Sequence, residues 1–188
     1  MLIRSMRRTH ARTVTNRGAS LLEVLVAILI LSFGMLSMAG LHAVAFKYGK
    51  MAQFRGVATQ LASDLADRMR ANVAGATAGG YAYTQAYDPN PTQITPRQCG
   101  NPAPCSAGEM ATLDLDQVRA TLQMALPGGG LFVQQDAAQA NVYDIWILWL
   151  DPEAHGNDAN STAASLTRCP DDIDATPMPQ CMPMRVAL

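Results

Sequence analysis

A single carboxylate lies inside a long apolar stretch near the start of this chain. From Val24 to Phe46 the sequence carries no charged residue, and Glu23 stands just inside the apolar run that begins at Leu21. A carboxylate surrounded by hydrocarbon is costly unless a cation pairs with it, so an acid at such a position is a candidate functional residue. We expect Glu23 to meet a positive partner, or else to extend its carboxylate to the membrane surface.

Four cysteines form the second group that could do chemistry, and all of them follow the apolar run: Cys99, Cys105, Cys169 and Cys181. Four cysteines allow three pairings, and the two close pairs suggest Cys99 with Cys105 and Cys169 with Cys181. Closing such short loops is worth about 2–3 kcal/mol each. Zinc and free thiols are the alternatives, but no C-x-x-C is present and only His155 could assist on that side.

Little in the sequence favours an enzyme. His10 precedes the apolar run, His42 lies within it, and His155 stands in an acidic stretch with Asp151, Glu153 and Asp158. That stretch could hold a cation, but a solvated surface is the favoured interpretation. No G-x-S-x-G is present, and no histidine stands at a telling distance from a cysteine. We therefore expect no catalytic residues, no cofactor and no metal, and we interpret Trp146 and Trp149 as core or subunit contacts.

The segment before and within the apolar run indicates how the chain is oriented. Residues 1–18 contain five of the 14 basic residues and none of the 15 acids, so the rest carries a net charge of −6. The 23 uncharged residues are long enough to cross a bilayer as a helix, and the basic flank predicts a cytoplasmic N-terminus. The cysteines then face a compartment where disulfides persist. The acidic remainder argues against nucleic-acid binding.

A secretory signal and a plain single-pass anchor are the simpler interpretations of this stretch. The run exceeds the roughly 7–15 apolar residues of a signal, although Ser37-Met38-Ala39 could imitate a late cleavage site. Neither interpretation accounts for the placement of Gly18 and Glu23. The sequence Gly18-Ala19-Ser20-Leu21-Leu22-Glu23-Val24-Leu25-Val26-Ala27 resembles the cleavage and methylation motif of type IV prepilins.

The resemblance implies a role for each residue of the motif. A prepilin peptidase would cut after Gly18 and methylate the amine of Ala19, where major pilins usually have phenylalanine. Glu23 would then be the fifth mature residue and pair with the N-terminal amine of a neighbouring subunit, which relieves the cost of burying either charge alone. On this basis the chain divides into a leader (1–18), a long helix (19–72) and a globular head (73–188).

Periodicity predicts that the long helix continues beyond the membrane. Residues 19–46 are apolar all round, whereas residues 47–72 are amphipathic. Their apolar stripe repeats at three- and four-residue steps and comprises Phe54, Val57, Ala58, Leu61, Leu65 and Met69. Asp64 and Arg68 stand at i,i+4 and can pair on the exposed face. Gly34, Gly40, Gly49 and Gly56 could let helices approach closely or let this helix loosen.

The head is expected to contain one more helix and a small sheet. Residues 73–108 read as a long loop, Ser106 and Glu109 have capping-box spacing, and a helix over about 109–126 should stop at the glycines 128–130. Strands are expected over 131–135, 142–150 and 182–188. The second has two apolar faces and should be central, with Ile145, Ile147 and Trp149 on one face and Trp146, Leu148 and Leu150 on the other. Pro183 confines the last strand to an edge or shortens it.

The expected fold class is α+β, a type IV pilin-like fold with a long N-terminal helix packed on a small antiparallel sheet. Most of the chain resembles the PilV type of minor pilin, including residues 61–72 and the tryptophan strand. The resemblance implies a subunit of a priming or tip complex, with prepilin peptidase, other minor pilins, the major pilin and inner-membrane lipid as partners. It would lie in the inner membrane with a periplasmic head, then in the fibre at the cell surface. The alternatives are a minor pseudopilin of type II secretion and a membrane-anchored periplasmic adhesin or binding protein.

Overall fold

The computed structural model describes residues 18, 20–99, 105–151 and 169–188. The chain forms two compact units, Met1–Tyr48 and Gly49–Leu188, which we describe separately. Helix α1 (Leu21–Ala71) supplies the described helix of the first unit and continues into the second. The long helix expected over 19–72 is therefore observed over nearly that range.

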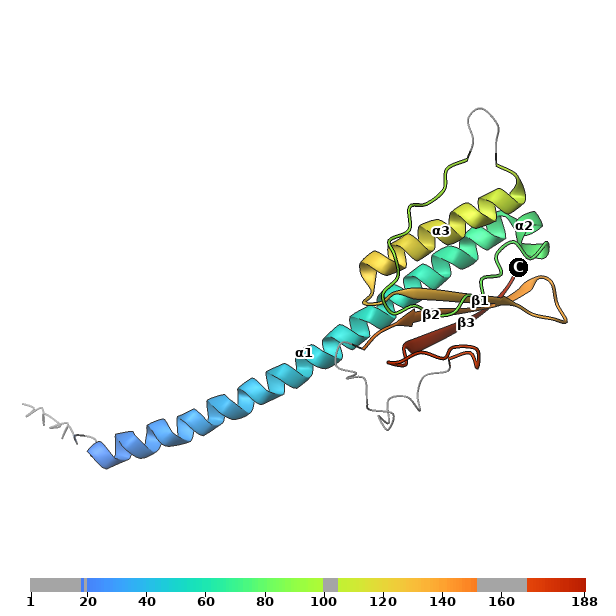
Figure 1. Cartoon of the computed structure of the whole chain (residues 1–188). Helices are drawn as coiled ribbons and strands as arrows, with labels where there is room; N and C mark the ends of the chain where they lie inside the picture. Colours follow the sequence, from blue (N-terminus) through green and yellow to red (C-terminus); the bar gives the residue numbers. More distant parts are fainter. Residues whose placement is uncertain (1–17, 19, 100–104, 152–168) are drawn as a thin grey trace, which may run out of the picture. The chain divides into compact units, whose positions relative to one another are not determined.

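The C-terminal unit combines helices with one small sheet (Figure 1). Besides the last part of α1, it contains α2 (Val73–Thr77), α3 (Ala107–Ala125), β1 (Gly130–Gln135), β2 (Val142–Trp149) and β3 (Gln180–Ala187). The sheet is antiparallel with the order β1-β2-β3. The expected α+β fold class is confirmed, and so is the central position of the strand that has two apolar faces.

Each face of the sheet has its own core, as the alternation of β2 predicts. Ile145, Ile147 and Trp149 pack with the stripe of α1 and with the apolar side of α3 in the larger core. Phe132 and Leu148 face the other way and form a second, small core with Ile173 and Cys181. The loop around Ile173 thus covers the second face of the sheet.

Helix α3 begins and ends where local signals place it. Ser106 accepts a hydrogen bond from the Glu109 amide and the Glu109 carboxylate bonds back to Ser106, which completes the capping box. Leu126 is the C-cap, and Gly128 follows with φ +58°, a left-handed conformation that suits glycine. The helix therefore starts two residues earlier than expected, because the box places the N-cap at Ser106.

The stretch 73–108 is not a loop throughout, and the expectation was wrong at its start. Asn72 caps the short helix α2 by accepting a hydrogen bond from the Gly75 amide at 3.2 Å. Residues 81–98, which we call the strap, are irregular, and the first of them lie along the free edge of β1. Tyr83 exchanges two backbone hydrogen bonds with Val133, and the Tyr87 hydroxyl donates to the Gly128 carbonyl at 2.7 Å. The strap therefore covers an edge that would otherwise expose unpaired backbone groups.

The opposite edge of the sheet carries β3, where Pro183 lies as expected. Pro183 is paired with Trp146 of β2, and a proline on an edge strand removes one donor from the exposed backbone. Strand β3 starts at Gln180, two residues before the expected start, because Gln180 still pairs with Trp149.

Candidate functional site

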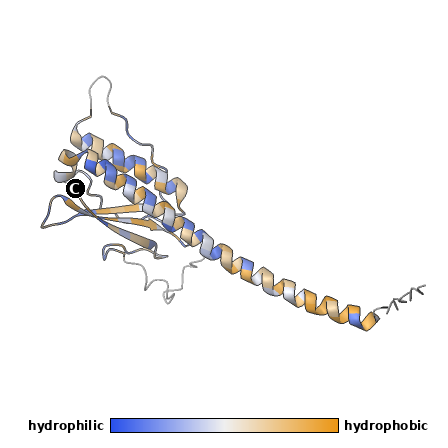
Figure 2. Cartoon of the chain, turned by 180° about the vertical axis from the view of Figure 1, so that it is seen from behind, coloured by the Kyte–Doolittle hydropathy of each residue, from blue (hydrophilic) through white to orange (hydrophobic). Residues whose placement is uncertain are grey.

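The first unit presents an apolar helix surface. Every described residue from Leu21 to Tyr48 is exposed, and large side chains such as Leu21 (84 %) and Phe46 (77 %) have no partner within the described part of the chain. Figure 2 shows the hydrophobic colouring running along this stretch of α1. By length and composition this helix could cross a membrane. An apolar surface of this extent needs lipid or other helices around it.

Glu23 lies in the first turn of this helix. The Ser20 carbonyl accepts hydrogen bonds from the amides of Glu23 (2.9 Å) and Val24 (3.2 Å), so the helix starts immediately after Ser20. A carboxylate in the first turn lies at the positive end of the helix dipole. Glu23 and Gly18 are both exposed. Residues 1–17 and Ala19 lie outside the described residues, so cleavage and methylation remain predictions.

The four glycines of α1 have open surroundings. An added Cβ at Gly34, Gly40, Gly49 or Gly56 would meet no atom within 4 Å. The space beside them is therefore free for another molecule, and the suggestion that they admit a close helix neighbour remains a prediction.

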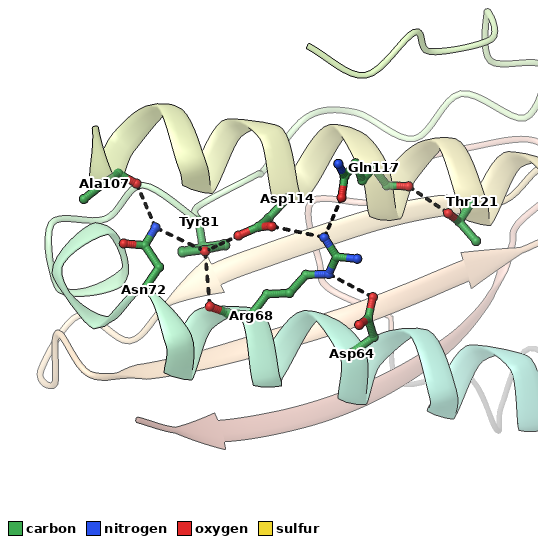
Figure 3. Close-up of polar contacts among 8 residues, drawn as sticks. All are labelled: Asp64, Arg68, Asn72, Tyr81, Ala107, Asp114, Gln117 and Thr121. Carbon is green, nitrogen blue, oxygen red and sulfur yellow. Dashed lines mark hydrogen bonds and ion pairs between the residues drawn. The ribbon is translucent and has the colours of Figure 1, made fainter. Parts of the chain in front are cut away.

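A polar cluster joins α1 to α3 in the second unit (Figure 3). The Arg68 guanidinium donates to Asp64 at 3.0 Å, to Asp114 at 3.1 Å and to Gln117 at 2.7 Å. The expected Asp64–Arg68 pair is thus present, but Arg68 does not stay on an exposed face. It is half-buried and reaches across to α3, where Asp114 is only 7 % exposed.

Tyr81 and Asn72 extend the cluster towards the start of α3. The buried Tyr81 hydroxyl donates to Asp114 at 2.6 Å and accepts from the Asn72 amide at 3.3 Å, while the same amide group donates to the Ala107 carbonyl at 2.8 Å. Burial, together with the hydrogen bond to Asp114, raises the pKa of Tyr81 well above its ordinary value. Each polar group at this junction therefore has a partner, as a buried cluster requires.

Sequence reasoning did not find this cluster. Asp114 and Tyr81 are 33 residues apart, and no local pattern connects them. The only signal was the i,i+4 spacing of Asp64 and Arg68, which indicates a surface pair rather than a bridge to another helix.

The cysteines form two disulfides, Cys99–Cys105 and Cys169–Cys181, with Cα atoms 5.3 and 5.1 Å apart. This is the pairing that the spacing suggested. The second disulfide closes the loop 169–181, and Ile173 of this loop packs in the small core with Phe132 and Leu148. The disulfide therefore anchors the cover of the outer sheet face to β3.

The residues considered for ligand chemistry lie only partly within the described part of the chain. Among residues 18, 20–99, 105–151 and 169–188, no group of three His, Cys, Asp or Glu side chains could hold a metal ion. His155, Glu153 and Asp158 lie outside the described residues. Trp149 is buried in the larger core and Trp146 stacks edge-on against Phe132, with ring centroids 5.6 Å apart, so both tryptophans are packing residues.

One of three comparisons with known proteins gives a match. Residues 42–116 match the family model described as Tt1218-like, type IV pilin Tt1218, which is less than half of the chain. No curated protein matches. No solved structure matches either. The matched range holds Asp64, Arg68, Asn72, Tyr81 and Asp114 of the polar cluster, and it excludes Gly18 and Glu23. The similarity to type IV pilins is thus independent of the N-terminal motif, and the long helix with its three-stranded sheet is consistent with a type IV pilin-like fold.

Proposed function

We propose that this protein is a minor pilin, a subunit that takes part in assembling a type IV pilus from the inner membrane. The observation that carries the proposal is the fully exposed apolar helix surface of Leu21–Tyr48, with Glu23 in its first turn, in a chain that matches a type IV pilin over residues 42–116. The helix would first sit in lipid and later among the helices of other pilins. The family match supports the pilin role, and the N-terminal motif supports processing by the peptidase.

The chemistry of the N-terminus follows from two charges. The basic leader keeps residues 1–18 in the cytoplasm until prepilin peptidase cuts after Gly18. Cleavage creates a positive amine on Ala19, and an amine about 4 Å from a carboxylate gains about 4 kcal/mol at an effective dielectric of about 20. In an assembled fibre, the amine of a neighbouring subunit would be the partner of Glu23 and would set the axial register. Such a pair discriminates against wrong register because a misplaced subunit leaves both charges unpaired in an apolar medium.

The priming or tip role rests on the resemblance to PilV-type minor pilins. In that role the head faces the periplasm and then the cell surface, and it contacts other minor pilins and the major pilin. The two disulfides suit such a compartment.

The first experiment is intact mass and N-terminal sequencing of the protein from membranes of its native host. We expect a chain that begins with N-methylated Ala19 and lacks residues 1–18. A Gly18→Val variant should keep its leader, whereas the control Gly34→Ala, at a glycine with open surroundings, should be cleaved normally. An intact N-terminus in the wild-type protein, or a cut near Ala39, would contradict the proposal.

The role of Glu23 is tested by incorporation into fibres. Glu23→Ala should be cleaved almost normally but should largely disappear from sheared fibres, while Glu23→Asp should retain part of the wild-type level. Ser32→Ala is the matched control, because it also removes a polar group from the exposed apolar stretch but only a hydrogen bond to the Ile28 carbonyl. Normal incorporation of Glu23→Ala would show that charge pairing is not needed.

The membranes and sheared fibres used in these experiments also distinguish the two alternative functions. A minor pseudopilin would be cleaved at Gly18 but would be absent from pilus fibres, and its deletion would block protein secretion. A membrane-anchored adhesin would keep the bond between Gly18 and Ala19 and would be indifferent to Glu23→Ala. Recovery of the mature chain in sheared pili supports the minor-pilin proposal over both.

A further inference from the structure

We propose that Arg68 is a positioning residue: it fixes the orientation of α3 on α1, and this fixed orientation lets the head fit neighbouring subunits. The orientation part stands on contacts within Gly49–Leu188 alone. The docking part rests on the proposed function.

Helix α3 is tied at two heights, once to Arg68 of α1 and once to Asn72, the residue that follows α1. At its N-terminus, the Asn72 amide donates to the Ala107 carbonyl at 2.8 Å. Seven to ten residues further along α3, Arg68 bonds to Asp114 and Gln117. At a rise of 1.5 Å per residue these ties lie roughly 10–15 Å apart along the axis of α3. Two separated ties oppose both sliding and rotation of one helix on the other, whereas a single tie would leave a pivot.

The first tie depends on a close approach of backbone. An added Cβ at Gly75 would lie 2.5 Å from the Asn72 amide nitrogen and 2.6 Å from the Ala107 carbonyl oxygen. Only glycine lets the start of α2 lie against this hydrogen bond. The sequence therefore supplies both the donor of this hydrogen bond, Asn72, and the space that it needs, at Gly75.

The second tie uses arginine in a way that lysine could not reproduce. One guanidinium nitrogen donates to Asp64 on its own helix, and another donates to both Asp114 and Gln117 on α3. A planar fork serves these partners from fixed directions, but an ammonium group has one nitrogen on a flexible stem. The Asp64 carboxylate thus orients the Arg68 guanidinium, and the guanidinium in turn orients α3.

Stability alone is a poor reason for this arrangement. Burying an ion pair costs desolvation that its attraction often only offsets, and well-packed apolar replacements can be equally stable. Most of the remaining contact between these helices and the sheet is apolar and non-directional. The Arg68–Asp114 pair adds a preferred orientation of one helix on the other. The Asp114 carboxylate is itself held in place, because the buried Tyr81 hydroxyl donates to its second oxygen at 2.6 Å.

The test compares Arg68→Lys with Arg70→Lys in the full mature chain in detergent. Arg70 is two residues away and also pairs with an acid of α1, Asp67 at 2.8 Å, so its substitution changes the same chemistry without touching the tie to α3. Nitroxides attached through noncanonical residues at Gln60 and Met124, both exposed, report the distance between α1 and α3 while the disulfides stay intact. Thermal unfolding and recovery in sheared fibres are measured on the same variants.

We expect a broadened nitroxide distance distribution for Arg68→Lys, unchanged widths for Arg70→Lys, and a midpoint of unfolding for Arg68→Lys within a few degrees of wild type. Recovery of Arg68→Lys in fibres should fall by about tenfold, the ratio that corresponds to about 1.4 kcal/mol. The apolar double variant Arg68→Met with Asp114→Leu should fold and should show the same broadening.

Each result that differs from these expectations would contradict one part of the proposal. An unchanged distance distribution for Arg68→Lys and for the double variant would refute the positioning role. A broadened distribution with normal recovery in fibres would refute the link to docking. If the wild-type protein is itself absent from fibres, the proposed function fails, while the distance measurement still decides whether Arg68 positions α3.

Discussion

Removing the disulfide between Cys169 and Cys181 should destabilise the head by an amount that its loop length sets. The two cysteines are 12 residues apart, and the chain-entropy relation for a loop of that length gives about 2.8 kcal/mol at 25 °C. The perturbation is Cys169→Ala combined with Cys181→Ala. Alanine is the right replacement because Cys181 is buried in an apolar core, where a serine hydroxyl would add a cost of its own.

The loss should appear locally as well as globally. The loop 169–181 would then be held mainly by the packing of Ile173 with Phe132 and Leu148. Residues 170–179 should therefore be cleaved by protease much earlier than β2 or α3, and the outer sheet face should bind a hydrophobic dye.

The assay is thermal and urea unfolding of the mature chain in detergent, followed by circular dichroism. For a head of this size, 2.8 kcal/mol corresponds to a fall in the midpoint of about 10 °C. The matched control is Cys99→Ala with Cys105→Ala, whose shorter separation of six residues gives about 2.2 kcal/mol and leaves the outer sheet face covered. A loss below about 1 kcal/mol for the first pair, or early cleavage of 170–179 only in the control, would refute the reasoning.

Three further changes have defined outcomes. Gly75→Ala should lower the unfolding midpoint clearly, because its Cβ would collide with the Ala107 carbonyl, whereas Gly56→Ala should be neutral or stabilising; equal midpoints would contradict this. Ser106→Ala removes the N-cap of α3 and should cost about 1 kcal/mol in urea unfolding. Burial raises the pKa of Tyr81 and of Tyr87, so both stay protonated in the folded state above pH 10 while the unfolded chain ionises. The free energy of unfolding should therefore fall as pH rises above about 10, and less steeply in Tyr81→Phe.

Several elements could be predicted from the sequence because their signals are local. The helix stripe from Phe54 to Met69 needs only a period of three to four residues, and the capping box of Ser106 and Glu109 spans one turn. The central place of β2 followed from its two apolar faces, since a strand that is apolar on both sides must be covered on both. Pro183 assigned the last strand to an edge because proline cannot donate to a ladder.

Other features were missed where the signal was weak or ambiguous. Helix α2 is only five residues long, and its alanines and glycines resemble a loop in composition. The strap was correctly seen as irregular, but its backbone bridge from Tyr83 to Val133 depends on where β1 lies. Neither could be recognised without the packing that surrounds it.

The sequence by itself determined the parts that one segment can specify: an apolar helix with Glu23 near its start, an amphipathic continuation, a capped second helix and a central strand. Only the tertiary structure decided which distant groups meet. Arg68 pairs with Asp114 because α3 folds back along α1. Ile173 packs with Phe132 because its loop is anchored to β3 through Cys181. The physical reason is that periodicity, caps and turns are settled within a few residues, whereas buried polar pairs and covered faces arise only when separate elements pack together.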